Sequence, residues 1–132
     1  MKKRIVKMKK KIVTGILLSA IVLSSSSVVM AKSYNTGSVG EFSFSGTSSV
    51  SATKAGAVTG SDPAVIVRVE ATYIKASTAT AKTKSSQKNA ESKGRASVAF
   101  SAGSGYISKS VQSRHFANYN GHINYFDTSD KY

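Results

Sequence analysis

Hydrophobic and polar residues alternate most regularly over residues 64–76 of this 132-residue chain. One side of the alternation is apolar and carries Val65, Val67, Val69, Ala71 and Tyr73, whereas the other side carries Ile66, Arg68, Glu70, Thr72 and Ile74. A period of two residues is typical of a β-strand with one buried face. The pattern therefore predicts a strand over 64–76. A polar alternation continues to Lys82, and because most strands are shorter than this, we expect a bend or bulge near Ser77.

Shorter alternating segments predict further strands. Phe42 and Phe44 share one face of residues 41–45, and residues 50–53 continue the alternation weakly. Residues 96–102 and 106–113 alternate on either side of a glycine-containing turn, which predicts that these two segments pair as a hairpin.

The segments without alternation are expected to be irregular. Residues 56–63 are predicted to form a loop, residues 32–40 a flexible N-terminal arm and residues 129–132 a frayed C-terminus. An all-β domain is then predicted over residues 41–128.

Asn120-Gly121 is the strongest turn signal in the chain. This dipeptide between alternating segments is preferred in two-residue type I′ hairpin turns. The turn fixes the register, and the predicted cross-strand pairs are Tyr119 with His122, Ala117 with Asn124, Phe116 with Tyr125, His115 with Phe126 and Arg114 with Asp127. One pair is aromatic and another is of opposite charge, and both kinds stabilise a hairpin.

The composition agrees with an all-β fold. All the leucines and all three methionines lie within the first 31 residues, so the rest of the chain relies on Val, Ile, Phe, Tyr and Thr for its bulkier side chains. These residues suit a pleated sheet, whereas Leu and Met favour helices. We predict a small antiparallel β-sandwich with a thin core, which oligomerisation or partner binding would stabilise further.

Residues 1–31 are typical of a cleaved secretory signal peptide. Seven basic residues fall in the first eleven positions, an apolar run spans residues 12–23, and Val29 and Ala31 suit the −3 and −1 positions. We therefore predict cleavage between Ala31 and Lys32 and secretion of the remainder. The alternative is an uncleaved anchor, which the length disfavours because a membrane span needs about 20 apolar residues.

Removing residues 1–31 takes away seven basic residues and changes the net charge from +13 to +6. A secreted and mildly basic domain is expected to meet an anionic bacterial cell envelope rather than nucleic acid. The heavily basic leader and the absence of cysteine are typical of a bacterial product, which we expect to be Gram-positive. Without cysteine the chain has no disulfide scaffold, lipid-modified cysteine or thiol nucleophile. Without a wall-sorting signal, it would be released or held non-covalently on the surface.

Residues 82–95 form the most basic segment of the predicted domain and are expected to be a hairpin tip. They carry Lys82, Lys84, Lys88, Lys93 and Arg95 against the single acid Glu91. Lysines of this kind either protect a sheet edge or contact an anionic envelope polymer. No aromatic residue lies between them, so the stacking platform of a single-strand nucleic-acid binder is missing.

Aromatic residues crowd the C-terminal hairpin. Phe116, Tyr119, Tyr125 and Phe126 either cover a small core or form an exposed aromatic surface for glycan, membrane interface or self-association.

Catalytic and metal chemistry find little support. His115 and His122 are predicted on one face about 13 Å apart, too far to share a metal ion, and are interpreted as surface or interface histidines. The chain has no G-x-S-x-G motif, and its six acids are scattered. We predict no catalytic residue, cofactor or metal.

The C-terminal half resembles the secreted bacteriocins of the lactococcin 972 type. The similarity lies in the alternating residues 95–102, the turn at Gly103–Gly105, residues 107–110, and then Phe116 and Tyr119. The resemblance implies a polar β-sandwich that acts without catalysis on a sensitive neighbour's wall synthesis, through a lipid-linked wall precursor. It also implies a membrane immunity protein as a partner.

Three functions remain open at this stage. The first is a secreted, bacteriocin-like protein that binds or acts on a bacterial envelope; the second is an adhesive surface protein that self-associates into homo-oligomers; the third, least favoured, is a small secreted hydrolase.

Overall fold

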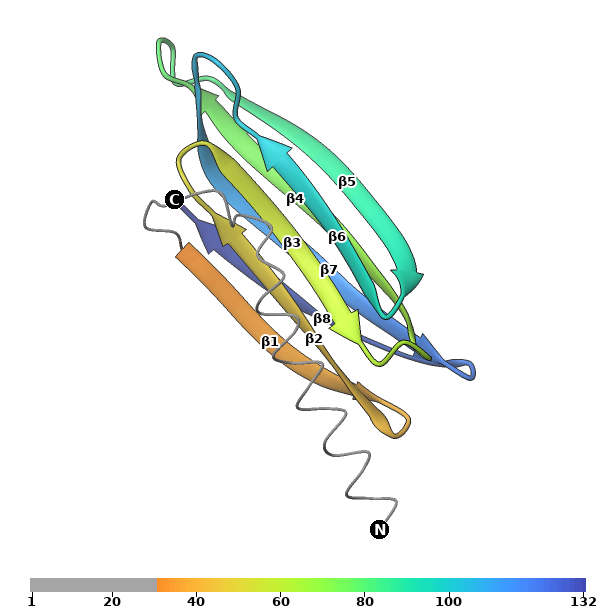
Figure 1. Ribbon diagram of the computed structural model, residues 1–132. Helices are drawn as coiled ribbons and strands as arrows, with labels where there is room; N and C mark the ends of the chain where they lie inside the picture. The colour runs from red at the N-terminus through yellow and green to blue at the C-terminus, as the bar shows by residue number, and fades with distance from the viewer. Residues whose placement is uncertain (1–30) are drawn as a thin grey trace.

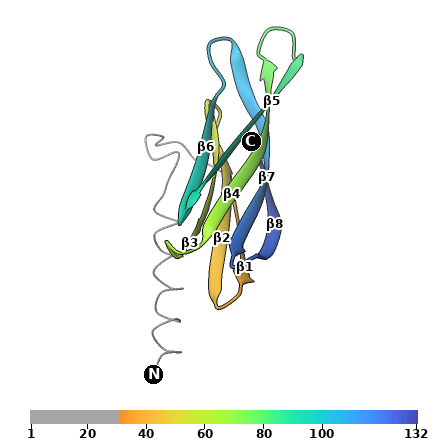
Figure 2. The same ribbon diagram turned by 90° about the vertical axis from the view of Figure 1, so that its right-hand side faces the viewer.

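The computed structural model describes residues 31–132, so the predicted signal peptide lies outside the described residues except for Ala31. Figure 1 and Figure 2 show two layers of antiparallel strands packed face to face. The strands are β1 (Ala31–Val39), β2 (Phe42–Val50), β3 (Lys54–Ser61), β4 (Ile66–Ser77), β5 (Thr83–Lys93), β6 (Arg95–Ser101), β7 (Tyr106–Tyr119) and β8 (His122–Lys131). One sheet has the order β1-β2-β3-β6 and the other β5-β4-β7-β8. The predicted all-β sandwich is confirmed.

The core forms between the two sheets, where the apolar sides of the alternating strands meet. Val67, Val69 and Tyr73 of β4 are fully or almost fully buried. The Tyr73 ring stacks on Phe100 of the opposite sheet at 4.9 Å between centroids, and Phe44 stacks on Phe126 at 4.8 Å. Burial of such side chains contributes about 1.5–3 kcal/mol each, so the thin core depends on a few aromatic pairs.

The C-terminal hairpin forms as predicted. Tyr119 pairs with His122, Phe116 with Tyr125 and Arg114 with Asp127, and the register continues unchanged to Ser110 and Lys131. Asn120 and Gly121 both have positive φ, at 52° and 82°, as a type I′ turn requires.

Replacing Gly121 with alanine should lower the unfolding free energy by about 1 kcal/mol, because an L-residue is strained at this φ. An added Cβ would meet no atom within 4 Å, so the loss would come from the backbone conformation alone. Urea unfolding measures it. Asn120→Gly is the matched control and should cost much less, and equal losses in the two variants would contradict this explanation.

Three segments predicted to be irregular are strands. The arm over 32–40 is β1, which pairs with β2 along its whole length; the loop over 56–63 falls mostly within β3, which is central in its sheet; and the C-terminal strand extends to Lys131 rather than fraying from residue 129. The local β-propensity of these Ser- and Gly-rich segments is weak. They are strands because their backbones form hydrogen bonds with neighbouring strands.

The predicted pairing of residues 96–102 with 106–113 is wrong. β6 pairs with β3 and β7 pairs with β4, so the turn at Gly103–Gly105 carries the chain from one sheet to the other. Both segments have an apolar face, and each buries it in the shared core from an opposite side.

The alternation that continues from residues 64–76 to Lys82 is interrupted as expected. The interruption consists of a shift in strand register and, beyond it, a turn. The register between β4 and β7 shifts between Ile74 and Lys75, close to the predicted bulge near Ser77, and β4 ends at Ser77. Residues 83–93 then return as β5, an edge strand paired with β4, and not as a hairpin tip.

Within residues 31–132, no helix is long and apolar enough to span a membrane.

Candidate functional site

The outer face of the β5-β4-β7-β8 sheet carries polar side chains in rows that cross all four strands. Cross-strand register places Asn89, Glu70, Arg114 and Asp127 in one row, and Gln87, Thr72, Gln112 and Ser129 in the next. Successive residues on one face of a strand are about 7 Å apart, so the two rows are close neighbours. This face is the side of the sheet that points away from the core. The same alternation that directs the apolar side chains of β4 into the core therefore directs its polar side chains onto this face.

Arginine and carboxylate side chains pair within the first row and between it and the adjacent row of Glu91, Arg68 and Phe116. The Arg114 guanidinium donates to both carboxylate oxygens of Asp127, at 2.8 and 3.1 Å, and Arg68 pairs with Glu70 and with Glu91. The hydrogen bond from Arg114 lowers the pKa of Asp127, and the same contact raises the pKa of Arg114. The bidentate geometry fixes the direction of both side chains while leaving them exposed to a ligand.

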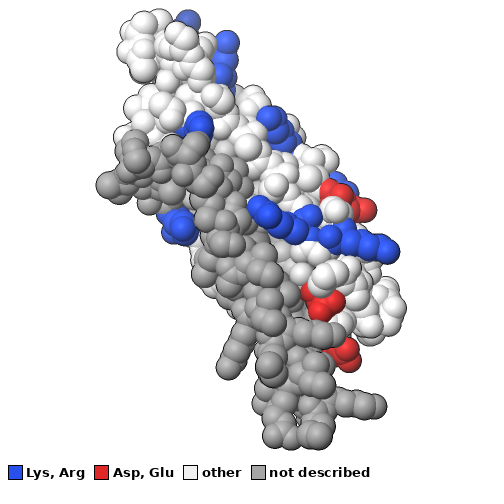
Figure 3. Space-filling view, viewed as in Figure 1, with Lys and Arg blue, Asp and Glu red and all other residues white. Residues whose placement is uncertain are grey.

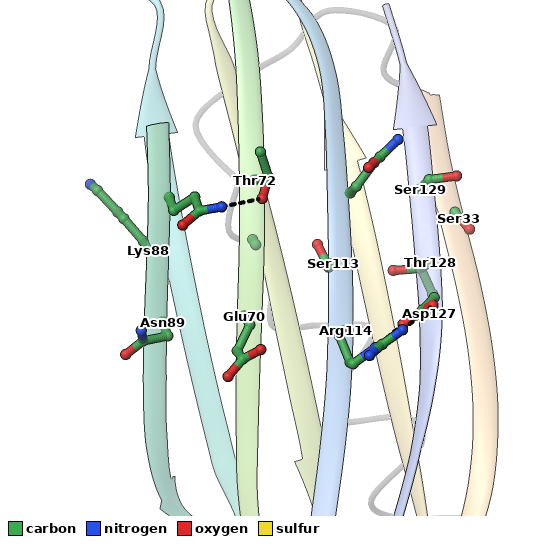
Figure 4. Close-up of a pocket in the computed structure, with 13 residues that line it drawn as sticks. Ser33, Glu70, Thr72, Lys88, Asn89, Ser113, Arg114, Asp127, Thr128 and Ser129 are labelled. Atoms are coloured by element: carbon green, nitrogen blue, oxygen red, sulfur yellow. Dashed lines mark hydrogen bonds and ion pairs between the residues drawn. The ribbon is translucent and has the colours of Figure 1, made fainter. Parts of the chain in front are cut away.

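The two rows line an open hollow of about 730 Å³ (Figure 4). Figure 4 shows that Glu70 and Thr72 of β4, Arg114 of β7, and Asp127 and Ser129 of β8 lie along it, while Lys88 extends away at the β5 side. Ser33 of β1 completes the border beyond β8. Gln87 donates a hydrogen bond of 3.4 Å to Thr72 across the β4–β5 pair.

One end of the same face is apolar. Phe116 and Tyr125 lie opposite each other with ring centroids 5.7 Å apart, and the Arg114 guanidinium lies 4.6 Å from the Tyr125 ring centre. Ile123 and Tyr125 are 65% and 52% exposed, so this end is open to solvent. A second hollow of about 410 Å³ lies beside it, between Ile66, Phe116 and Ile123. Polar rows and an exposed aromatic ring therefore share one surface.

The chemistry of this face suits binding. Two acidic side chains, Glu70 and Asp127, line the larger hollow, and their charges are balanced by the arginines that pair with them, Arg68 and Arg114. Amide and hydroxyl groups supply both donors and acceptors. Glu70 and Asp127 are each paired with an arginine, and the pKa of Asp127 is lowered, whereas a general acid needs a raised pKa.

The interpretation of His115 as a surface histidine is wrong. His115 is fully buried between the sheets, with Nδ1 2.7 Å from Thr59 Oγ1 and Nε2 2.8 Å from Thr128 Oγ1. Burial lowers its pKa to about 4. Thr128 also contacts Ser48, which donates to Ser113, so a polar network joins both sheets inside the core. His122 lies exposed at the hairpin turn, and the structure does not bring the two histidines together.

The five basic candidates do not form one patch. Lys82 precedes β5, Lys93 ends it, and Arg95 begins β6, while Lys84 lies 5.2 Å from the Tyr106 ring centre. Lys88 donates to the carbonyl of Ala99 on β6 at 2.7 Å. Figure 3 shows Lys and Arg spread along the border formed by β5 and β6. The contact of Lys88 with a carbonyl of an edge strand favours the edge-protecting interpretation over an envelope-contacting patch.

The four aromatic candidates are divided between the two faces of the hairpin. Phe116 and Tyr125 lie on the outer face, whereas Phe126 packs against Phe44 in the core and Tyr119 packs edge-on against Phe42 at 4.9 Å. Two of the four rings therefore cover the core, and the other two lie on the outer surface, where only Tyr125 is largely exposed. Alternation within the hairpin could have separated them, because residues of opposite parity point to opposite faces.

Sequence reasoning missed the residues at the centre of the hollow, Glu70, Thr72, Gln87, Gln112 and Ser129. The polar side of β4 was a signal for two of them. Gln112 becomes a neighbour through the β4–β7 pairing, which the predicted hairpin of residues 96–113 excluded. Gln87 becomes one through the β4–β5 pairing, whereas its segment was predicted to be a hairpin tip. Ser129 lies on the part of β8 that was predicted to fray.

Residues 31–132 contain no group of three or more His, Cys, Asp or Glu side chains that could hold a metal ion. Comparison with protein-family models, with curated proteins and with solved structures found no match to this chain.

Proposed function

We propose that this protein is a secreted, non-enzymatic module that binds a glycan polymer of a bacterial cell envelope through the outer face of its β5-β4-β7-β8 sheet. The observation that carries the proposal is the pair of polar rows across four strands, with no net charge in the hollow and an exposed tyrosine at its end.

Hydroxyl-rich ligands need donors and acceptors close together. The amides of Gln87, Gln112 and Asn89 supply both, and the Arg114–Asp127 pair presents a fixed donor and acceptor beside them. Tyr125 offers an apolar ring face on which a sugar ring can lie. An open hollow suits a polymer, because a long chain can enter the hollow at one end and leave it at the other.

The charge balance narrows the ligand class. The sequence led us to expect an anionic polymer, but the basic side chains lie along the β5–β6 border and the hollow itself is neutral. We therefore expect a neutral or weakly charged polysaccharide to bind better than a phosphate-rich one. Growth inhibition of related Gram-positive bacteria would extend the proposal to the bacteriocin-like activity implied by the resemblance.

Replacing Tyr125 with alanine should weaken binding roughly tenfold, because the aromatic contact and the adjoining Arg114 position are both lost. Gln87→Ala and Gln112→Ala should each weaken binding several-fold, since a net hydrogen bond contributes about 1 kcal/mol. Titration calorimetry with soluble fragments of purified Gram-positive wall polysaccharide measures both effects.

Tyr34→Ala is the matched control, because Tyr34 is also an exposed tyrosine but lies on β1 in the other sheet. Its affinity should equal that of the unmodified protein. Equal losses for Tyr34→Ala and Tyr125→Ala, or tight binding of teichoic acid with no binding of neutral polysaccharide, would contradict the proposed site. Concentration-dependent oligomers that Ile123→Ser disrupts would support the self-associating alternative instead.

A further inference from the structure

The first and last strands lie side by side at one border of the sandwich, although they belong to different sheets. β1 is the edge of one sheet and β8 is the edge of the other (Figure 1). Asn124 of β8 donates from Nδ2 to the carbonyl of Ser38 at 2.9 Å, and the backbone N–H of Ser33 donates to the carboxylate of Asp130. Contacts at both ends therefore hold β1 beside β8.

Asp130 is incompletely paired at this border. Its Oδ2 atom is buried and has no hydrogen-bond partner among residues 31–132. Burial raises the pKa of Asp130 to about 6, and the charge of Lys32 and the Ser33 N–H offset this only in part. A carboxylate that is withdrawn from water without a full set of partners destabilises the fold when it is ionised.

We propose that cleavage between Ala31 and Lys32 creates an α-ammonium group that pairs with the carboxylate of Asp130 and fastens β1 to β8. The proposal rests on the predicted cleavage position and goes beyond the binding function.

The new group would lie one residue before the backbone N–H that already contacts Asp130. The backbone N–H that already donates to Asp130 belongs to Ser33, and the nitrogen of the preceding residue lies about 4 Å away. Before cleavage this Lys32 nitrogen is a neutral amide with one hydrogen. After cleavage it carries a positive charge and three hydrogens, which leaves donors for Asp130 even if one remains directed at β2. The Lys32 side chain is the other charge acting on Asp130.

The same pairing would connect processing to the hollow. Ser33 lies at the border of the hollow beside Thr128 and Ser129, so fastening β1 fixes that border. The uncleaved chain would lack this pairing.

The test compares chains 32–132 with a free α-amino group, with an acetylated one, and with Gly-Ser added before Lys32. All eight strands lie within residues 31–132, so each chain retains both sheets. At pH 7 the free amine should raise the urea midpoint by roughly 0.5 M over either blocked form. Asp130→Asn should abolish the difference, whereas Asp127→Asn, a matched change on the outer face of β8, should preserve it.

Equal midpoints for the free and blocked chains, or the same difference in Asp130→Asn, would overturn the ion pair. Intact mass of the exported protein gives its N-terminal residue directly. An N-terminus other than Lys32 would overturn the proposal for the natural protein, and because neither measurement uses a glycan, both outcomes are distinct from failure of the binding function.

Discussion

Replacing Gly46 with alanine should lower the unfolding free energy by about 3 kcal/mol, the upper range for overpacking a filled core. Gly46 lies on β2 directly against the buried ring of His115. A Cβ at this position would lie 2.5 Å from both Cδ2 and Nδ1 of that ring. The ring cannot retreat easily, because Thr59 and Thr128 hold its two nitrogens from opposite sides. Urea unfolding followed by circular dichroism measures the loss.

A double-mutant cycle identifies the cause. If the clash with the imidazole is responsible, Gly46→Ala should cost far less in a His115→Ala background, because the added methyl group then fills part of the space the ring leaves. Additive losses would show that Gly46 matters for another reason, such as the conformation of β2, and would contradict the proposed contact.

The contact at Gly46 also shows why part of the fold is not apparent in the sequence. The strand over 64–76 and the hairpin at Asn120-Gly121 could be predicted because their alternation and turn residues are local. β1, β2 and β3 are rich in Ser, Gly and Thr, and Gly46 and Thr59 suit their positions because His115 from the other sheet occupies the space between. Such long-range complementarity leaves no periodic pattern.

The candidate face, like the fold, could be predicted only where its contacts are close in sequence. Arg114 opposite Asp127 and Phe116 opposite Tyr125 follow from the hairpin register alone. Glu70 and Thr72 were correctly placed on the polar side of their strand, but their neighbours Gln87 and Gln112 depend on pairings between segments 15 to 40 residues apart. The emphasis on Lys82–Arg95 followed from charge alone, and charge does not reveal whether lysines cap a sheet edge or face a ligand.

Stability should depend strongly on pH through His115. Its pKa is lowered to about 4 in the folded protein, against about 6.5 for an unperturbed histidine, so the unfolded chain binds the proton more readily. The contribution of neutral His115 is complete above pH 6.5 and is lost as the pH falls toward 4, by about 3 kcal/mol in total. Asp130 acts in the opposite direction, because its raised pKa favours the folded protein as the pH falls below 6.

Comparison of the protein with its His115→Asn variant between pH 7.5 and pH 4.5 isolates this effect, since Asp130 is common to both chains. The variant should be less stable at pH 7.5, where the two threonine contacts are impaired, and the difference should narrow steadily toward pH 4.5 because the substituted amide has no proton to gain. His122→Asn is the matched control, an exposed histidine in the same hairpin, and should keep the profile of the unmodified protein. A difference that stays constant with pH would mean that His115 is not buried in its neutral form, and the polar network between the sheets would need another explanation.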